Sequence, residues 1–334
     1  MNINEVIITL LKLPRIGKVT TRKIIDKIYN PSITLYDIVD YFNKNKRLDI
    51  TYEDVDEANK HAKDVLNSCD LNGINIVNYC DDKFPKKLLM LKIPPVLLYY
   101  KGDLERLITY PSIAIVGSRE PSNYGVEVAK KYTKYFVDKD INIISGLAKG
   151  IDSISHEMTV LNDGYAVAFV AQGLGTPIYP KESRELAEKI LKCSGLLMSE
   201  YEPNIGPNRN FFVERDRLQC GASDSVLVIE TDVDGGTMHA AKGALDLGRI
   251  CAVLDHPEKF KLNNFKSRGN QKLINELGAM PVFDKDSLDK LTEMITYEHQ
   301  KNILNVNSDD KNSDYNSSEK KSENLKSDQL TLDI

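Results

Sequence analysis

The middle of the chain alternates short apolar runs with amphipathic stretches. Segments 126–137, 182–191 and 238–247 carry apolar residues at helical spacing, and they lie among apolar runs at 113–116, 141–144, 166–170, 196–198, 226–229 and 250–254. Buried parallel strands are nearly continuously apolar, whereas the helices that connect them have one apolar stripe. The pattern therefore predicts an α/β domain over 72–283: a Rossmann-like, doubly wound and mostly parallel sheet covered on both faces.

Residues 1–68 follow a different pattern. Apolar residues recur there at helical spacing, namely Ile3, Val6, Ile7, Leu10 and Leu11, and 21–29 is a second candidate helix. The short turn Leu13-Pro14-Arg15-Ile16-Gly17 lies between the two. This arrangement predicts a small N-terminal helical domain, either a helix-hairpin-helix or a helical bundle. Backbone N–H groups of such a turn can bind a phosphate, although a turn that serves only packing is favoured.

The C-terminal part of the chain becomes polar. A charged helix is predicted over 284–304, and the stretch 305–328 holds only three sizeable apolar side chains. Such a stretch cannot bury enough apolar surface to offset its ordering entropy, so residues 305–334 are expected to form a disordered tail.

Charge and cysteine content narrow the possible functions. The net charge of −5 means that any DNA site must be a local basic patch on a mildly acidic body. The five cysteines are scattered without a CxxC pair, and the histidines lack metal-ligand spacing, so neither a disulfide framework nor a metal or other cofactor is predicted. No signal peptide or membrane-spanning run is evident, and a cytoplasmic location is expected.

Small and basic residues follow several of the predicted strands. Gly117-Ser118-Arg119 comes after 113–116, and Ser145-Gly146 with Lys149 comes after 141–144, where Asp152 is expected to cap the next helix. Gly235-Gly236-Thr237 opens the helix after 226–229, and Phe212, Arg215 and Arg217 precede that strand. Ligands of doubly wound sheets bind beyond the carboxyl ends of the strands, so these residues predict an anion-binding edge.

The common catalytic signatures are missing from the chain. There is no GxGxxG after the first strand, no GxxxxGK[ST] and no GxSxG. His156 and His239 lie near predicted helix starts without an evident nucleophile, and packing roles are favoured for both. The chain is therefore expected to perform no covalent chemistry.

An ordered set of motifs resembles the DprA/Smf family. The set comprises Gly117-Ser118-Arg119, Tyr124-Gly125, Ser145 to Asp152, His156, Tyr179-Pro180, Ser199-Glu200-Tyr201, and Phe212 with Arg215 and Arg217. It extends upstream to Phe84-Pro85 and Pro94-Pro95 and downstream to Gly269-Asn270. The resemblance covers roughly 72–283, and an N-terminal helical unit is also typical of the family.

The resemblance implies an extended Rossmann fold that binds single-stranded DNA, commonly as a homodimer. It also implies protection of incoming strands and assistance in loading the recombinase RecA during natural transformation. Arg119 would contact the DNA backbone, Lys149 would fill a basic position, and Arg215 and Arg217 would match the outer residues of an Arg-Asn-Arg motif. Phe212 would stack on a base. The central asparagine of that motif is Asp216 in this chain, a carboxylate that could weaken the grip on phosphate.

Three further hypotheses remain open. The terminal residues Gln329, Leu330, Leu332 and Ile334 resemble the short peptides that bind the bacterial sliding clamp, although a chance apolar cluster is equally favoured. An alternative function is a phosphoribohydrolase acting on a nucleotide monophosphate, with Glu200 or Glu230 as general acid or base. The third is a nucleotide- or partner-sensing scaffold that has lost DNA binding through Asp216.

Overall fold

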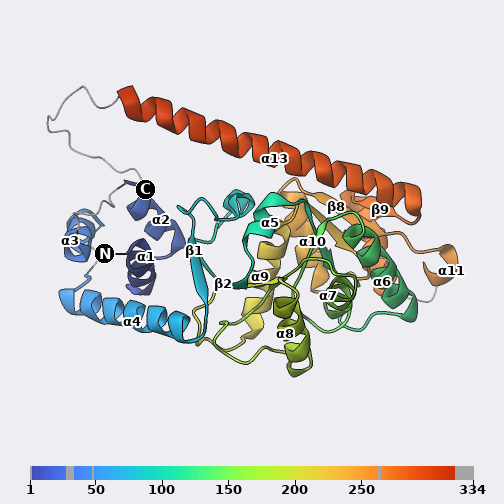
Figure 1. The fold of residues 1–334 in the computed structure, drawn as a ribbon, viewed down its shortest axis with the longest axis horizontal. Helices are drawn as coiled ribbons and strands as arrows, with labels where there is room; N and C mark the ends of the chain where they lie inside the picture. The colour runs from blue at the N-terminus through green and yellow to red at the C-terminus, as the bar shows by residue number, and fades with distance from the viewer. Residues whose placement is uncertain (1, 28–33, 47–48, 262–264, 320–334) are drawn as a thin grey trace.

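A computed structural model describes residues 2–27, 34–46, 49–261 and 265–319 of the chain. A helical unit lies at one end, a sheet domain fills the centre, and one long helix crosses the top (Figure 1). The helical unit contains α1 (Ile3–Lys12), α2 (Lys18–Lys27), α3 (Leu35–Lys46) and α4 (Tyr52–Leu71).

The central sheet has nine strands in the order β1-β2-β6-β5-β4-β3-β7-β8-β9. The strands are β1 (Asn75–Asn78), β2 (Leu97–Gly102), β3 (Ser112–Val116), β4 (Asn142–Ser145), β5 (Ala166–Phe169), β6 (Leu196–Ser199), β7 (Ser225–Val228), β8 (Ile250–Leu254) and β9 (Met280–Val282). Pairing is parallel from β6 to β9, while β2 runs antiparallel to both β1 and β6. The predicted fold class is confirmed, and the six apolar runs correspond to β3 through β8.

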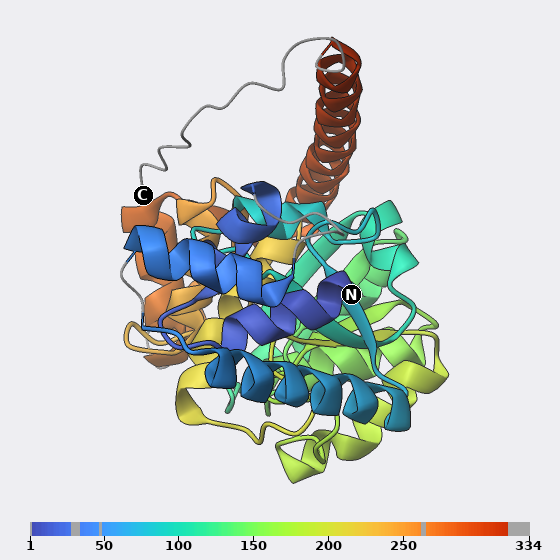
Figure 2. The same ribbon diagram turned by 90° about the vertical axis from the view of Figure 1, so that its left-hand side faces the viewer.

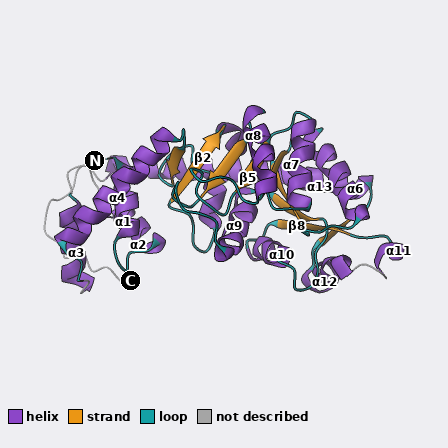
Figure 3. Cartoon of the chain, turned by 90° about the horizontal axis from the view of Figure 1, so that it is seen from below, coloured by secondary structure: helices purple, strands orange, loops and turns teal. Residues whose placement is uncertain are grey.

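Helices cover both faces of the sheet, as Figure 3 shows. The helices are α5 (Glu105–Thr109), α6 (Asn123–Val137), α7 (Ile151–Leu161), α8 (Arg184–Lys192), α9 (Arg209–Ala222), α10 (Thr237–Asp246), α11 (Glu258–Lys261), α12 (Arg268–Leu277) and α13 (Lys285–Glu319). Short 3-10 turns lie at η1 (Lys86–Met90), η2 (Lys181–Ser183) and η3 (Phe265–Ser267). Alternate residues of β3 enter different cores: Ile113 and Ile115 pack toward α6, and Ala114 and Val116 join the core that includes α9 and α10.

The N-terminal helices pack directly on the sheet domain. Val6 and Ile7 of α1 belong to the same buried core as Leu97 and Leu98 of β2. Polar contacts also join the unit to the loop 200–208 that follows β6. The pairs are Lys18 with Glu200 at 2.7 Å, His61 with Glu202 at 2.8 Å, and Ser68 with Asn204 at 3.1 Å. Figure 2 views the molecule from the side of these helices.

Helix α13 is longer than the predicted span of 284–304. It begins at Lys285, buries Leu288, Leu291 and Ile295 against the sheet domain, and runs to Glu319, rising away from the body in Figure 2. No proline or glycine interrupts 285–319, and extending an existing helix costs far less than starting one. The proposed clamp-binding residues Gln329, Leu330, Leu332 and Ile334 lie outside the described residues.

Candidate nucleic-acid interface

The chain leaves the neighbouring strands β3 and β7 in opposite directions, and we call the region between the loops that follow them the crevice. These strands are neighbours, yet the chain leaves β3 toward β4 on one side and leaves β7 toward β8 on the other. This is the topological switch point of the sheet, where doubly wound proteins bind their ligands. The loop after β3 holds Gly117, Ser118 and Arg119, and the loop after β7 leads to Gly235, Gly236 and Thr237.

Glu230 joins the two loops at the base of the crevice. Its backbone carbonyl accepts the Ser118 N–H at 2.7 Å, and its carboxylate accepts the Ser122 N–H at 2.7 Å and the Ser122 hydroxyl at 2.5 Å. His256 Nε2 lies 3.2 Å from the same carboxylate. Burial alone would raise the pKa of Glu230, but the hydrogen bonds from His256 and Ser122 lower it. Its carboxylate is therefore committed to holding the loops together.

The loop after β4 packs against the loop after β3. The Ile151 N–H donates to the Ser118 carbonyl at 3.1 Å, and a Cβ on Gly150, whose φ is +81°, would lie 2.3 Å from that carbonyl oxygen. Leu147 is buried with a φ of 55°, a left-handed conformation that is unusual for a residue other than glycine. The loop thus needs a glycine at 150 to approach its neighbour, and Lys149 is left exposed beside it.

Asp152 does not cap the helix that follows this loop, and that prediction was wrong. The N-cap position of α7 is Gly150, and Asp152 lies within the first turn, where its carboxylate accepts the Gly146 N–H at 3.1 Å. Burial raises the pKa of Asp152 to about 6. Ser145 is likewise buried and donates its hydroxyl hydrogen to the Ile115 carbonyl at 2.7 Å. Both side chains shape the loop from inside.

A cation and several aromatic rings lie together above this edge. The Arg119 guanidinium lies over the Phe212 ring at 5.3 Å from its centroid, and Phe212 meets Tyr179 edge to face at 6.0 Å. Tyr201, from the loop after β6, stacks on Phe211 at 3.9 Å. Arg119 is exposed, and no carboxylate of the described residues is within ion-pair distance of it. We call Arg119, Phe212 and Tyr179 the first platform.

Lys149 faces the same edge but is paired. Its ammonium lies 2.8 Å from the Glu182 carboxylate, and more than half of each side chain is exposed. Ion pairs between exposed side chains contribute about 0–1 kcal/mol, so a ligand phosphate can replace Glu182 at little cost.

Arg215 lies beneath the edge rather than on it. Its side chain is 3% exposed, its Nη1 donates to the Phe169 carbonyl at 2.7 Å, and its Nε is 3.1 Å from an Asp216 oxygen. A Cβ on Gly146 would lie 1.4 Å from Nη1, so Gly146 makes room for the guanidinium. Burial, together with the nearby charge of Arg215, lowers the pKa of the adjacent His156 to about 3.

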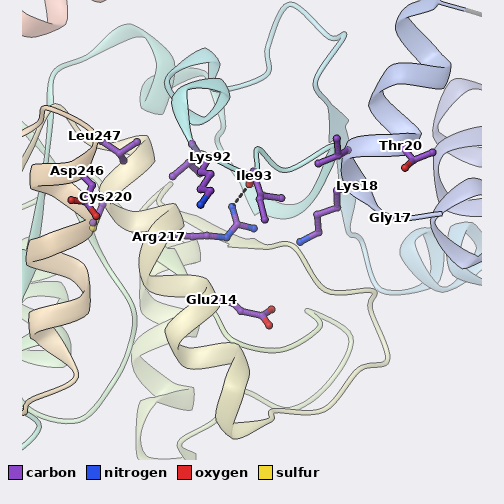
Figure 4. A pocket seen from close by; sticks show the side chains of 13 residues that line it. Gly17, Lys18, Thr20, Lys92, Ile93, Glu214, Arg217, Cys220, Asp246 and Leu247 are labelled. Carbon is purple, nitrogen blue, oxygen red and sulfur yellow. Dashed lines mark hydrogen bonds between the residues drawn. The ribbon is translucent and has the colours of Figure 1, made fainter. Parts of the chain in front are cut away.

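Arg217 points into a different space. It lines a cavity of about 660 Å³ between α9, α10 and the start of α2, with Lys18 and Lys92 nearby (Figure 4). Its guanidinium donates to the Ile93 carbonyl at 2.8 Å and pairs with Glu200, which also holds Lys18. The structure therefore brings Arg119, Lys149 and Phe212 to one edge and leaves Arg215 and Arg217 away from it.

Helix α10 presents its N-terminus to the crevice. Gly236 is its N-cap, no side chain caps it, and a Cβ on Gly236 would meet nothing within 4 Å. Thr237 begins the helix, and exposed His239 follows in the first turn. Free N–H groups at a helix N-terminus attract anions. His239 was expected to pack near the helix start, whereas the structure leaves its side chain exposed in the first turn of α10.

Other classes of site have little support in the described part of the chain. No group of three or more histidine, cysteine, aspartate or glutamate side chains there is arranged to hold a metal ion. The five cysteines are all free thiols. None of the described helices combines the length and apolar character needed to cross a membrane.

Comparison with known proteins identifies the class of protein that this fold and edge define. Residues 75–294, about two thirds of the chain, match the family model of the DNA recombination-mediator protein A. The chain belongs to this family.

Relatives of the chain include proteins described as DNA processing protein DprA and as protein Smf. The chain is 35% identical over 177 residues to DNA processing protein DprA of Bacillus subtilis, a match covering 53% of this chain and 59% of the relative. It is 32% identical over 239 residues to protein Smf of Synechocystis, covering 67% and 60% respectively. The matches to these curated relatives thus span about 60% of their length.

Two solved structures of the family are similar to the chain. The DprA structure from Streptococcus pneumoniae has a TM-score of 0.67 at 27% identity, covering 84% of this chain and 92% of that one. The Helicobacter pylori DprA structure, described for its mode of single-stranded DNA binding, has a TM-score of 0.59 at 26% identity and covers 67% and 96%.

Proposed function

We propose that the chain binds single-stranded DNA at the switch-point edge, and that it does so without covalent chemistry. The observation that carries this proposal is the first platform, where an exposed guanidinium, with no carboxylate partner among the described residues, lies over an aromatic ring. Aromatic faces accept any unpaired base, and a neighbouring cation neutralises the phosphate beside it. Duplex DNA keeps its bases stacked inside, so this chemistry favours single strands.

Three sources of positive potential surround the path of the phosphates. Arg119 supplies a forked donor, Lys149 supplies an exchangeable ammonium, and the uncapped α10 N-terminus supplies backbone N–H groups at Thr237. All three would act on the phosphate groups of the DNA backbone, which are the same in every DNA sequence. Binding is therefore expected to be sensitive to salt and largely indifferent to base sequence.

The biological role that we propose follows the family. A DNA-processing protein of this kind would protect single strands that enter the cytoplasm and assist a RecA-type recombinase in coating them, in natural transformation or recombination. We further propose that it acts as a homodimer. The clamp-binding role of residues 329–334 stays a prediction, which a sliding-clamp pull-down with and without those residues would test.

The alternative of nucleotide hydrolysis has less physical support. Glu230 is buried among hydrogen bonds from Ser122 and His256, and Glu200 is held by Lys18 and Arg217. A general acid or base must reach its substrate, and both carboxylates are committed elsewhere. We therefore expect no free adenine after incubation with AMP.

Binding to labelled single-stranded and double-stranded oligonucleotides of one sequence, over a range of salt concentrations, tests the proposal. We expect tighter binding to the single strand and a linear fall in log affinity with log salt. Equal affinity for both forms, or no binding to either at low salt, would refute it.

A further inference from the structure

A second pair of stacked aromatic rings lies on the other side of the switch point. Tyr124, in the first turn of α6, stacks on Phe260 of α11 with ring centroids 4.4 Å apart and planes 16° from parallel. The Lys259 ammonium lies over the Phe260 ring at 4.9 Å from its centroid. Both rings are partly exposed.

The position of this pair is set by the same residues that build the crevice. Gly125 follows Tyr124, and a Cβ on it would lie 2.5 Å from the Glu230 carboxylate, so α6 begins directly against the crevice base. His256, which contacts that carboxylate, also lies beside the Tyr124 ring, with centroids 5.7 Å apart. The pair therefore stands at the carboxyl ends of β7 and β8.

The two sides of the crevice repeat one chemical arrangement. On the first platform a guanidinium lies over a phenyl ring, and on this second one an ammonium lies over a phenyl ring. Tyr179 follows β5 and Phe260 follows β8, which are four strand positions apart in the sheet. At about 4.8 Å per strand, the strand ends that lead to these two rings are on the order of 20 Å apart along the edge, whereas Arg119 and Tyr124 both follow β3. The α10 N-terminus lies between them.

We propose that Tyr124, Phe260 and Lys259 form a second base-stacking subsite for the same strand, which crosses the switch point from the first platform. This inference rests on the proposed function and extends it by giving the strand a second contact and a minimum length. An unpaired base would stack on an outer ring face, and Lys259 would turn from the ring to the adjacent phosphate. Short oligonucleotides would reach one platform only.

The absence of tryptophan from the chain permits a direct test. Phe260→Trp and Phe212→Trp each introduce a single fluorophore at one platform, and Tyr297→Trp places one on the exposed surface of α13 as a control. Each variant is titrated with oligothymidylates of about 4 to about 16 nucleotides, the range of known single-strand site sizes. We expect short strands to quench the tryptophan fluorescence of Phe212→Trp, and only longer strands to quench that of Phe260→Trp. No strand of any length should quench the fluorescence of Tyr297→Trp.

Affinity provides an independent measurement on the same platform. Phe260→Ala should weaken binding of the longest strand roughly 5-fold or more and leave the shortest unaffected, while Phe260→Tyr should bind like the parent. Phe260 is partly exposed on a four-residue helix, so we expect the fold to tolerate this change.

The outcomes separate the two proposals. If the parent binds single strands but fluorescence at 260 is unchanged and Phe260→Ala binds every length normally, the second subsite is refuted and the first platform stands. If the parent binds no oligonucleotide, the proposed function fails and this inference fails with it.

Discussion

The rim of the switch point contains an exposed arginine, and the layer directly beneath it contains a buried one. At the rim, Arg119 is exposed above Phe212 and has no carboxylate partner among the described residues. In the layer beneath, Arg215 is 3% exposed, donates to a backbone carbonyl and lies beside Asp216. An exposed guanidinium can exchange water for a phosphate at small cost, whereas a buried one is fixed by the groups it compensates. Depth, rather than residue type, separates the two roles.

The largest difference should be seen in stability. Arg215→Met removes a buried cation from beside Asp216 and Asp152, and breaking such a pair costs about 3–5 kcal/mol in free energy of unfolding. Arg119→Met should change that free energy by no more than about 0.5 kcal/mol. Urea denaturation of both variants measures the contrast. If both variants lost similar amounts of unfolding free energy, the distinction between the rim and the buried layer would be wrong.

A smaller effect should appear as a dependence of stability on pH. Burial lowers the pKa of His156 to about 3, well below the ordinary value of about 6.5 for histidine. The unfolded chain binds this proton below about pH 6.5 and the folded chain does not, so stability is present above 6.5 and is lost as pH falls toward 3. Between pH 7 and 5 the parent should lose about 2 kcal/mol more than His156→Leu. Urea denaturation at several pH values tests this, and parallel curves would contradict it.

In DNA binding, unlike in stability, we expect the larger effect from the exposed rim residue Arg119. Arg119→Ala removes a charge-assisted contact and should weaken single-strand affinity about 10-fold at moderate salt. Lys189→Ala on α8, which removes an exposed charge paired with Glu185, is the matched control and should bind like the parent. Fluorescence anisotropy with a labelled strand measures both. Parent-like binding by Arg119→Ala would show that the rim assignment is wrong.

The smallest effect is expected at the boundary between the layers. Burial raises the pKa of Asp216, while the charges of Arg215 and Arg119 oppose this change. Asp216→Asn removes a negative charge near the rim, so single-strand affinity should rise a few-fold, and the salt dependence should steepen slightly. If the parent shows no measurable binding to single strands and Asp216→Asn binds them tightly, the scaffold hypothesis would be supported instead.

The sequence predicts the sheet better than it predicts the depth of each side chain. The strands β3 to β8 are evident because strands buried on both faces are nearly all apolar. The motif that contains Arg215 and Arg217 lies within α9, where neighbouring positions point in different directions, so one residue enters the buried layer and the other faces the α2 cavity. Nothing in the local pattern distinguishes them.

Contacts between distant segments were equally hidden. Phe260 stacks on Tyr124 although a large part of the sheet domain separates them in sequence. Phe260 lies between two lysines and Tyr124 lies in a family motif, but neither segment indicates that the other is its neighbour. Asp152 was expected at a helix cap because its residue type favours caps, but a positive φ at Gly150 places the start of α7 two residues earlier. Such errors come from backbone geometry that composition does not encode.

The loop 200–208 contacts both the helical domain and the sheet edge. It holds the helical domain through Glu200, Glu202 and Asn204, and it supplies Tyr201 to the aromatic surface at the sheet edge. Whatever shifts this loop by binding at the edge must alter the free energy of the domain contact. Thermodynamic reciprocity then requires that a molecule gripping the helical domain change the edge affinity by the same factor. Under this coupling, occupancy of the sheet edge would be detectable at the helical domain, and occupancy of the helical domain would be detectable at the edge.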